Sequence, residues 1–105
     1  FNKDLHEIAA QLKKHSVTGS FTSNKENNKC GVIAYLNRIK YYWPNSNNLT
    51  PNQQLESAQK MNLRYYLFFY SNKWEKDCFT QTISTKYTLD SIDIYPGIMA
   101  IRLND

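Results

Sequence analysis

The spacing of apolar residues near the N-terminus predicts a helix over residues 3–14. Four of them recur at intervals of three and four residues: Leu5, Ile8, Ala9 and Leu12. In a helix of 3.6 residues per turn, that spacing gathers the four side chains on one face. We therefore expect this helix to cover one side of the core.

A second helix is predicted over about 51–62. Thr50 supplies an N-cap, Pro51 suits the first helical position, and Gln53 can complete a capping box. A narrow apolar stripe follows, formed by Leu55, Ala58 and Met61.

Four other segments have the composition of strands: 17–22, 64–70, 78–87 and 92–103. Segment 64–70 is apolar or aromatic on both faces, which is typical of a strand in the middle of a sheet. In segment 92–103, Pro96 and Gly97 occupy the two central positions of a type II turn, so we expect a strand or a pair of strands there.

The segment 30–43 fits two structures. Alternation places Ile33, Tyr35, Ile39, Tyr41 and Trp43 on one face of a strand. Helical spacing aligns Val32, Leu36, Ile39 and Trp43 equally well. The density of aromatic and β-branched residues favours the strand.

These elements predict an α+β fold in one small domain that spans residues 1–105. Consecutive strands with short connections favour an antiparallel sheet of four or five strands, with both helices packed on one face. The longest nearly apolar run has six residues, 65–70, far fewer than the roughly 20 that a transmembrane helix needs. We therefore expect no membrane span.

The two cysteines, Cys30 and Cys78, suggest one disulfide, which would place the protein in the periplasm or outside the cell. The other reading is a pair of buried, unpaired thiols. The chain begins with Phe1 rather than Met, which we interpret as a processed start or a fragment.

Thirteen Lys and Arg residues against nine Asp and Glu residues give a net charge of +4, which slightly favours acidic partners. The basic residues are scattered along the chain, whereas nucleic-acid-binding proteins usually concentrate them. Nucleic acid is therefore the weaker choice of partner.

Candidate chemistry is sparse. The two histidines and two cysteines lack zinc-binding spacing, and no phosphate-binding loop or nucleophile elbow occurs, so we predict neither metal nor cofactor. A metal-independent ribonuclease of the toxin type needs a base, an acid and a cation. The residues that could supply them are His6, His15, Lys13, Lys14 and Arg64.

Exposed aromatic side chains offer a different function. Trp74 lies in a polar segment, and Trp43 and Tyr42 end an aromatic run. Aromatic residues are enriched at protein interfaces. The preferred hypothesis is a non-enzymatic protein-binding domain of an exported protein, either a subunit of a surface assembly or an inhibitor or immunity-type binder. The ribonuclease is the alternative.

Overall fold

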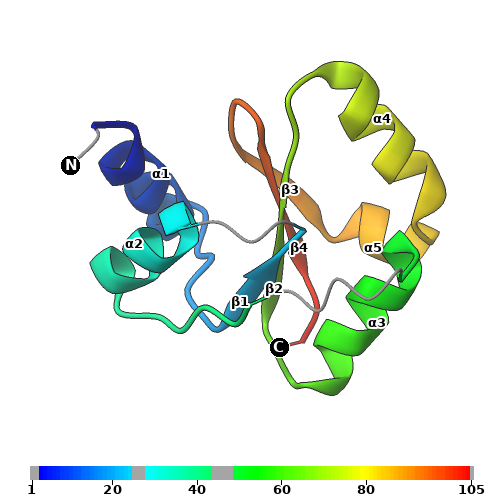
Figure 1. Cartoon of the computed structure of the whole chain (residues 1–105), viewed down its shortest axis with the longest axis horizontal. Coiled ribbons are helices and arrows are strands. Elements are labelled where there is room, and N and C mark those ends of the chain that lie inside the picture. Colours follow the sequence, from blue (N-terminus) through cyan, green and yellow to red (C-terminus); the bar gives the residue numbers. More distant parts are fainter. Residues whose placement is uncertain (1–2, 25–27, 44–48, 105) are drawn as a thin grey trace.

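The computed structural model describes residues 3–24, 28–43 and 49–104. Five helices and four strands follow one another along these residues (Figure 1). In chain order they are α1 (Lys3–Lys14), β1 (Phe21–Ser23), α2 (Asn28–Asn37), α3 (Pro51–Lys60), β2 (Tyr65–Phe69), α4 (Lys73–Thr82), α5 (Thr85–Leu89), β3 (Ser91–Tyr95) and β4 (Ile98–Arg102).

The four strands form one mixed sheet in the order β1-β2-β4-β3. Strand β1 pairs with β2 in parallel, Phe21 opposite Tyr65, whereas β2 and β3 both pair with β4 in antiparallel fashion. The two inner strands, β2 and β4, carry the apolar residues predicted for a central strand. The parallel pair is a difference from the fully antiparallel sheet that short connections predicted.

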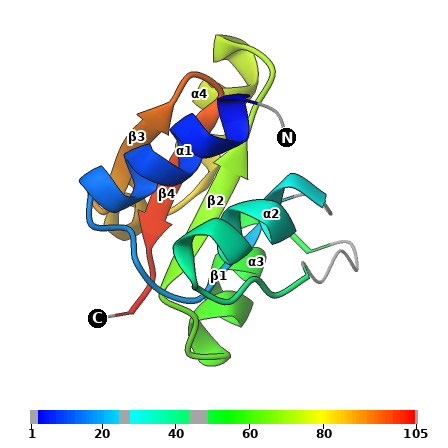
Figure 2. The ribbon, with the colours of Figure 1, turned by 90° about the vertical axis from the view of Figure 1, so that its left-hand side faces the viewer.

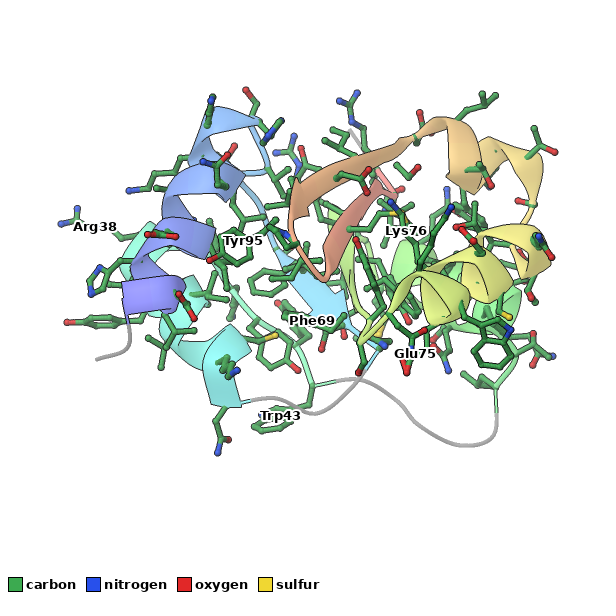
Figure 3. The ribbon with its side chains drawn as sticks, turned by 90° about the horizontal axis from the view of Figure 1, so that it is seen from above. Arg38, Trp43, Phe69, Glu75, Lys76 and Tyr95 are labelled. Carbon is green, nitrogen blue, oxygen red and sulfur yellow. The ribbon has the colours of Figure 1, made fainter. Side chains whose placement is uncertain are left out.

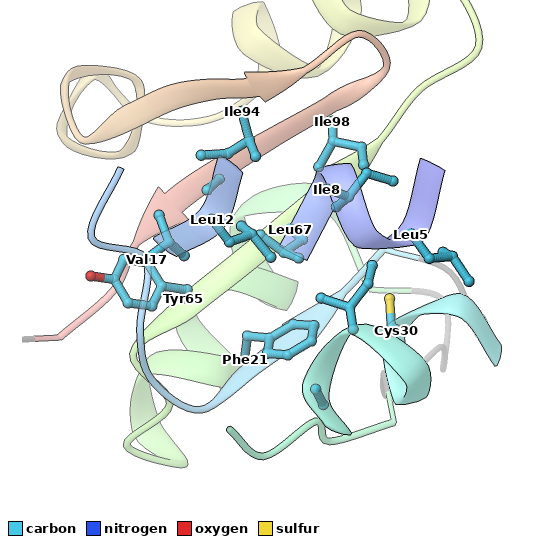
Figure 4. Close-up of a cluster of buried hydrophobic side chains, with 13 residues drawn as sticks. Leu5, Ile8, Leu12, Val17, Phe21, Cys30, Tyr65, Leu67, Ile94 and Ile98 are labelled. Carbon is cyan, nitrogen blue, oxygen red and sulfur yellow. The ribbon is translucent and has the colours of Figure 1, made fainter. Parts of the chain in front are cut away.

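Helices cover both faces of the sheet (Figure 1). Alternation along β2 explains this, because Tyr65 and Leu67 enter one buried cluster while Tyr66 and Phe68 enter another. The first cluster receives α1 and α2 (Figure 4), and the second receives α3, α4 and α5. The α+β class and the strand count are confirmed. The two predicted helices, however, lie on opposite faces of the sheet rather than on one.

The strand favoured over 30–43 is wrong, and the helical alternative is correct only as far as Asn37. Helix α2 ends at Asn37, and Arg38 has a φ of 55°, which turns the chain back towards β1. The buried stripe is Cys30, Ile33 and Ala34, a different face from the one that the helical alternative selected. Helix α2 lies in front of β1 in Figure 2. Tyr41 then forms a single parallel bridge to Phe21.

The strand predicted over 78–87 is wrong. Those residues form the second half of α4 and the first three residues of α5. Asn72 caps α4 by accepting a hydrogen bond from the backbone N–H of Glu75. Phe79, Ile83 and Tyr87 are buried against the sheet. Their spacing of four residues fits a helix as well as it fits alternation.

Two local signals are confirmed. Thr50 and Gln53 form the expected capping box at the start of α3. Pro96 and Gly97 join β3 to β4, and Gly97 has a φ of 91°, close to the value that the third residue of a type II turn requires.

Candidate binding site

A pocket lies between the edge strand β1 and helix α3. Its lining comes from three stretches of chain and contains no charged side chain among the described residues: Thr22, Ser23, Asn24, Trp43, Leu49, Gln54, Ser57, Ala58, Met61, Leu63 and Tyr66. The enclosed volume is about 30 Å³. That is room for one or two water molecules, so anything larger must rest partly on the rim.

Thr22 is the unusual polar residue of this pocket. Its neighbour Phe21 points into the cluster under α1 and α2, so Thr22 points to the opposite face of the sheet, where α3 lies. Thr22 is only 6% exposed, and its Oγ1 has no hydrogen-bond partner among the described residues. Because buried hydroxyls are nearly always hydrogen-bonded, this atom requires an explanation.

The polar groups beside Thr22 are occupied. Tyr66 donates its hydroxyl to Gln54 Oε1 at 2.8 Å, and Gln54 Nε2 donates to the carbonyl of Leu49 at 3.2 Å. Burial raises the pKa of Tyr66 well above its ordinary value, which keeps this hydroxyl protonated as a donor. Asn24 bonds the backbone N–H and carbonyl of Phe69 through its amide, at 2.8 and 3.0 Å.

The rim of the pocket carries large apolar side chains that face solvent. Trp43 is 58% exposed and Met61 is 54% exposed. Figure 3 shows Trp43 at the margin of the molecule. Its ring lies 5.7 Å from that of Tyr41, and Tyr41 lies 5.2 Å from Phe21, so a chain of aromatic contacts connects Trp43 to the core. These ring contacts already restrict the exposed indole of Trp43, so a partner that binds it loses little side-chain entropy there.

The other two aromatic residues predicted to bind a partner lie elsewhere. Tyr42 packs against the second buried cluster, and Lys40 Nζ lies 5.7 Å from its ring centroid. Trp74 is 73% exposed in the first turn of α4. It is not part of the pocket lining, so of the three predicted residues only Trp43 contributes to this site.

The residues predicted for a ribonuclease are divided. His15 comes directly after the last residue of α1. Arg64 donates its backbone N–H to the carbonyl of Ser20. The aliphatic stem of Arg64 covers Gly19, where an added Cβ would lie 2.6 Å from Arg64 Cδ. His6 lies nine residues before His15, roughly 13 Å along a helix axis, so the two imidazoles do not form a pair.

Lys13 and Lys14 are exposed in the last turn of α1. Neither histidine and neither of these lysines belongs to the described lining of the pocket between β1 and α3. Helix α1 lies on the opposite face of the sheet from α3 (Figure 1). In the part of the chain that the structure describes, no three His, Cys, Asp or Glu residues gather as a metal site would require.

The predicted disulfide is wrong, because both thiols are free. Cys30 belongs to α2, and its side chain is completely buried (Figure 4). Cys78 is exposed on α4, across the sheet. Burial raises the pKa of Cys30 to about 11, although hydrogen bonds with Ser23 and Tyr41 partly oppose this shift. The alternative prediction, two buried and unpaired thiols, is therefore correct for Cys30 and wrong for Cys78, whose thiol is exposed.

A second hollow, of about 500 Å³, lies between the start of α4 and the turn that joins β3 to β4. Two lysines line it, Lys73 and Lys76. Lys76 Nζ lies 2.8 Å from Asp93 Oδ1 and 5.6 Å from the ring centroid of Tyr70. The ion pair raises the pKa of Lys76. This hollow is open, and one of its two lysines is held in an ion pair, so it is the weaker candidate.

Most of the pocket could not be recognised in the sequence. Thr22 lies in a strand, as predicted. Met61, predicted to belong to a buried stripe of the helix over 51–62, is the C-cap of α3 and is 54% exposed, so that prediction is wrong: α3 ends at Lys60, one residue before it.

None of the described helices is long and apolar enough to span a membrane. Comparisons with family models, curated proteins and solved structures found no match to this chain.

Proposed function

We propose that this domain binds a partner protein through the Trp43 surface, which consists of Trp43, Leu49 and Met61 around the pocket between β1 and α3. One observation carries the proposal: two large apolar side chains, each more than half exposed, meet at the rim of one pocket. Single exposed apolar residues are normal on a protein surface. Their concentration around a concavity is what distinguishes interaction sites.

The size and chemistry of the pocket favour a protein as the ligand. Pockets that enclose a metabolite or cofactor usually measure about 300–1,000 Å³ and present a few charged or strongly polar groups. This pocket encloses about 30 Å³ and has no charged lining among the described residues. Such a site suits the tip of one side chain of a partner, while the surrounding surface supplies most of the contact area.

The arrangement of titratable groups also supports binding over catalysis. His6 and His15 lie on the α1 side of the sheet, away from the pocket. None of the five residues predicted to supply a base, an acid and a cation lines this pocket in the part of the chain that the structure describes. The periplasmic or extracellular location stays a prediction. Its main support was the disulfide, and the structure has both cysteines free.

Comparison of two tryptophan variants tests the proposal. Partners captured from the native source by the wild-type domain would be compared with those captured by Trp43→Ala and by Trp74→Ala. Both side chains are largely exposed, so neither substitution should unfold the protein. We expect Trp43→Ala to lose a partner that Trp74→Ala retains. The complex rebuilt from purified components should weaken by about 2 kcal/mol or more on loss of Trp43.

The opposite result, a partner lost with Trp74 and kept without Trp43, would move the interface to α4 and refute the proposed surface. A second assay addresses the enzyme: the purified domain is incubated with RNA in the presence of a chelator. RNA should remain intact. Cleavage that disappears in His6→Ala or His15→Ala would replace binding with nuclease activity as the function.

A further inference from the structure

Helix α2 carries apolar residues on both its faces, although it lies on the outside of the molecule (Figure 2). Its inner face is buried in the first cluster. Its outer face carries Val32, Tyr35 and Leu36, which recur at intervals of three and four residues. Tyr35 is 82% exposed, and Leu36 is half-buried and belongs to neither described cluster. Because a helix that is apolar on both faces is normally covered on both, this outer face is typical of an interaction surface.

The outer face of α2 is a ridge rather than a groove. Tyr35 projects from it, and at Gly31, one turn earlier, an added Cβ would meet no atom within 4 Å. Among the described residues, none from α1 or α2 lines either of the two hollows described above. The outer face of α2 therefore suits a partner that can adapt its own shape to a convex surface.

The net charge of the protein lies on the same side of the sheet. Residues 1–43 contain seven Lys and Arg residues and three Asp and Glu residues, whereas residues 44–105 contain six of each kind. The whole net charge of +4 thus belongs to the part of the chain that forms α1, β1 and α2. Both of these helices cover one face of the sheet (Figure 1). This asymmetry favours an anionic partner on that face.

The cations nearest to the ridge are Lys29 in the first turn of α2, and Arg38 and Lys40 just beyond its end. All three are exposed, and Arg38 projects from the molecule (Figure 3). Segment 28–43 contains no acidic residue. Of the acidic residues of α1, Glu7 accepts a hydrogen bond from Tyr95 of β3 and so lies towards the other edge of the sheet. The ridge is therefore apolar with positive charge at both ends.

We propose that the α2 surface, which consists of Val32, Tyr35 and Leu36 with Lys29, Arg38 and Lys40, binds to the surface of an anionic phospholipid membrane. Such a membrane presents phosphate and carboxylate groups above acyl chains, and tyrosine is enriched at that boundary. The cations would meet the headgroups while the ridge enters between them. This inference goes beyond the proposed protein partner and does not depend on it, because the α2 and Trp43 surfaces share no residue.

The same observations disfavour two other occupants. A second copy of the chain would bring two faces of equal positive charge together. A protein partner anchors its main side chains in pockets or grooves, and the outer face of α2 offers a ridge. A lipid surface needs no pocket, since its headgroups rearrange around the protein.

Sedimentation with vesicles tests the inference. One set of vesicles contains phosphatidylcholine alone, and the other contains about one-third phosphatidylserine. We expect the wild-type domain to bind the anionic vesicles at least about tenfold more tightly, because several cations each contribute about fivefold. High salt should weaken this binding, since it screens exposed charges.

Two pairs of variants assign the binding to α2. Tyr35→Ser removes the ring of the ridge and Arg38→Gln removes one cation, and each should weaken binding to anionic vesicles by about fivefold. Trp74→Ser and Lys73→Gln make matched changes on α4, across the sheet, and should leave binding unchanged. All four side chains are exposed, so the variants should keep the wild-type circular dichroism spectrum and melting temperature.

Four results would overturn the inference: no binding to anionic vesicles, equal binding to both kinds of vesicle, binding by Tyr35→Ser at the wild-type level, or equal losses in the α2 and α4 variants. Binding of RNA or polyglutamate by a domain that ignores vesicles would assign the charged face to an anionic macromolecule instead. If vesicles bind while Trp43-dependent capture fails, only the protein partner is refuted. If capture succeeds while vesicles do not bind, only the membrane is refuted.

Discussion

The two cysteines should react with an alkylating reagent at very different rates. Cys78 is exposed, whereas Cys30 is 0% exposed in the first buried cluster. With a pKa of about 11 rather than 9.0, about one Cys30 thiol in a thousand is ionised at pH 8, instead of about one in ten. Ionisation alone therefore slows the reaction of Cys30 by about a hundredfold.

Burial also keeps the reagent away. The reagent reaches Cys30 only when the packing of α2 on the sheet opens, and each 1.4 kcal/mol of opening free energy lowers the rate by about tenfold. Because the opened thiol regains its ordinary pKa, the two effects do not multiply. We therefore expect Cys30 to react at least about a hundredfold more slowly than an exposed thiol with an ordinary pKa.

Intact mass after a timed exposure to iodoacetamide measures both rates. Protein purified without reductant should gain one adduct under native conditions and a second only in denaturant. In a Cys78→Ser variant, the native protein should gain none. A protein that takes up no reagent in denaturant until it is reduced would contain the disulfide after all. Two adducts at similar native rates would refute the burial of Cys30.

Three further predictions concern stability. Phe79→Ala should lower the free energy of unfolding by about 3–5 kcal/mol, because it removes a buried ring whose centroid lies 3.9 Å from that of Phe68 on the sheet. Trp74→Ala on the same helix should change the free energy of unfolding by less than about 0.5 kcal/mol, because Trp74 is exposed. Since burial raises the pKa of Cys30, the folded state holds that proton more tightly. Stability should be unaffected below pH 9 and fall by up to about 3 kcal/mol between pH 9 and 11. Asp93→Asn breaks the ion pair with Lys76 and should cost less than about 1 kcal/mol, because Asp93 is largely exposed.

Urea denaturation followed by circular dichroism measures all three. Equal losses for Phe79→Ala and Trp74→Ala would contradict the packing of α4 on the sheet. A Cys30→Ala variant should lose less stability than the wild type over the same pH range, and an identical profile would assign the effect to another group. A large loss in Asp93→Asn would show that the ion pair is more shielded from water than its geometry indicates.

Several elements could be predicted because their signals are local. The stripe of α1 and the capping box of α3 each lie within one or two helical turns, where neighbouring residues alone decide the structure. The hairpin of β3 and β4 likewise depends on Pro96 and Gly97, whose own backbone preferences form the turn. The residues of β2 are apolar in succession, which already indicates burial on both faces.

Segments 30–43 and 78–87 could not be decided in this way. Phe79, Ile83 and Tyr87 are spaced by four residues, an interval that keeps side chains on one face of a helix and on one face of a strand alike. What makes the segment helical is the uncovered second face of the sheet, which those three side chains bury. Such a surface exists only after β2 and β4 have paired.

The candidate site depends on the tertiary structure even more. Sequence alone determined that Trp43 is a large aromatic residue and that residues near 51–62 form a helix, since composition and local spacing contain both facts. The pocket arises because parallel pairing of β1 with β2 brings Thr22 beside α3, although the two are about thirty residues apart. Whether a threonine hydroxyl finds a partner depends on every atom that packs around it, and chain neighbours do not specify those atoms. For that reason the residue types were readable from the sequence, while their meeting in one pocket was decided by the fold.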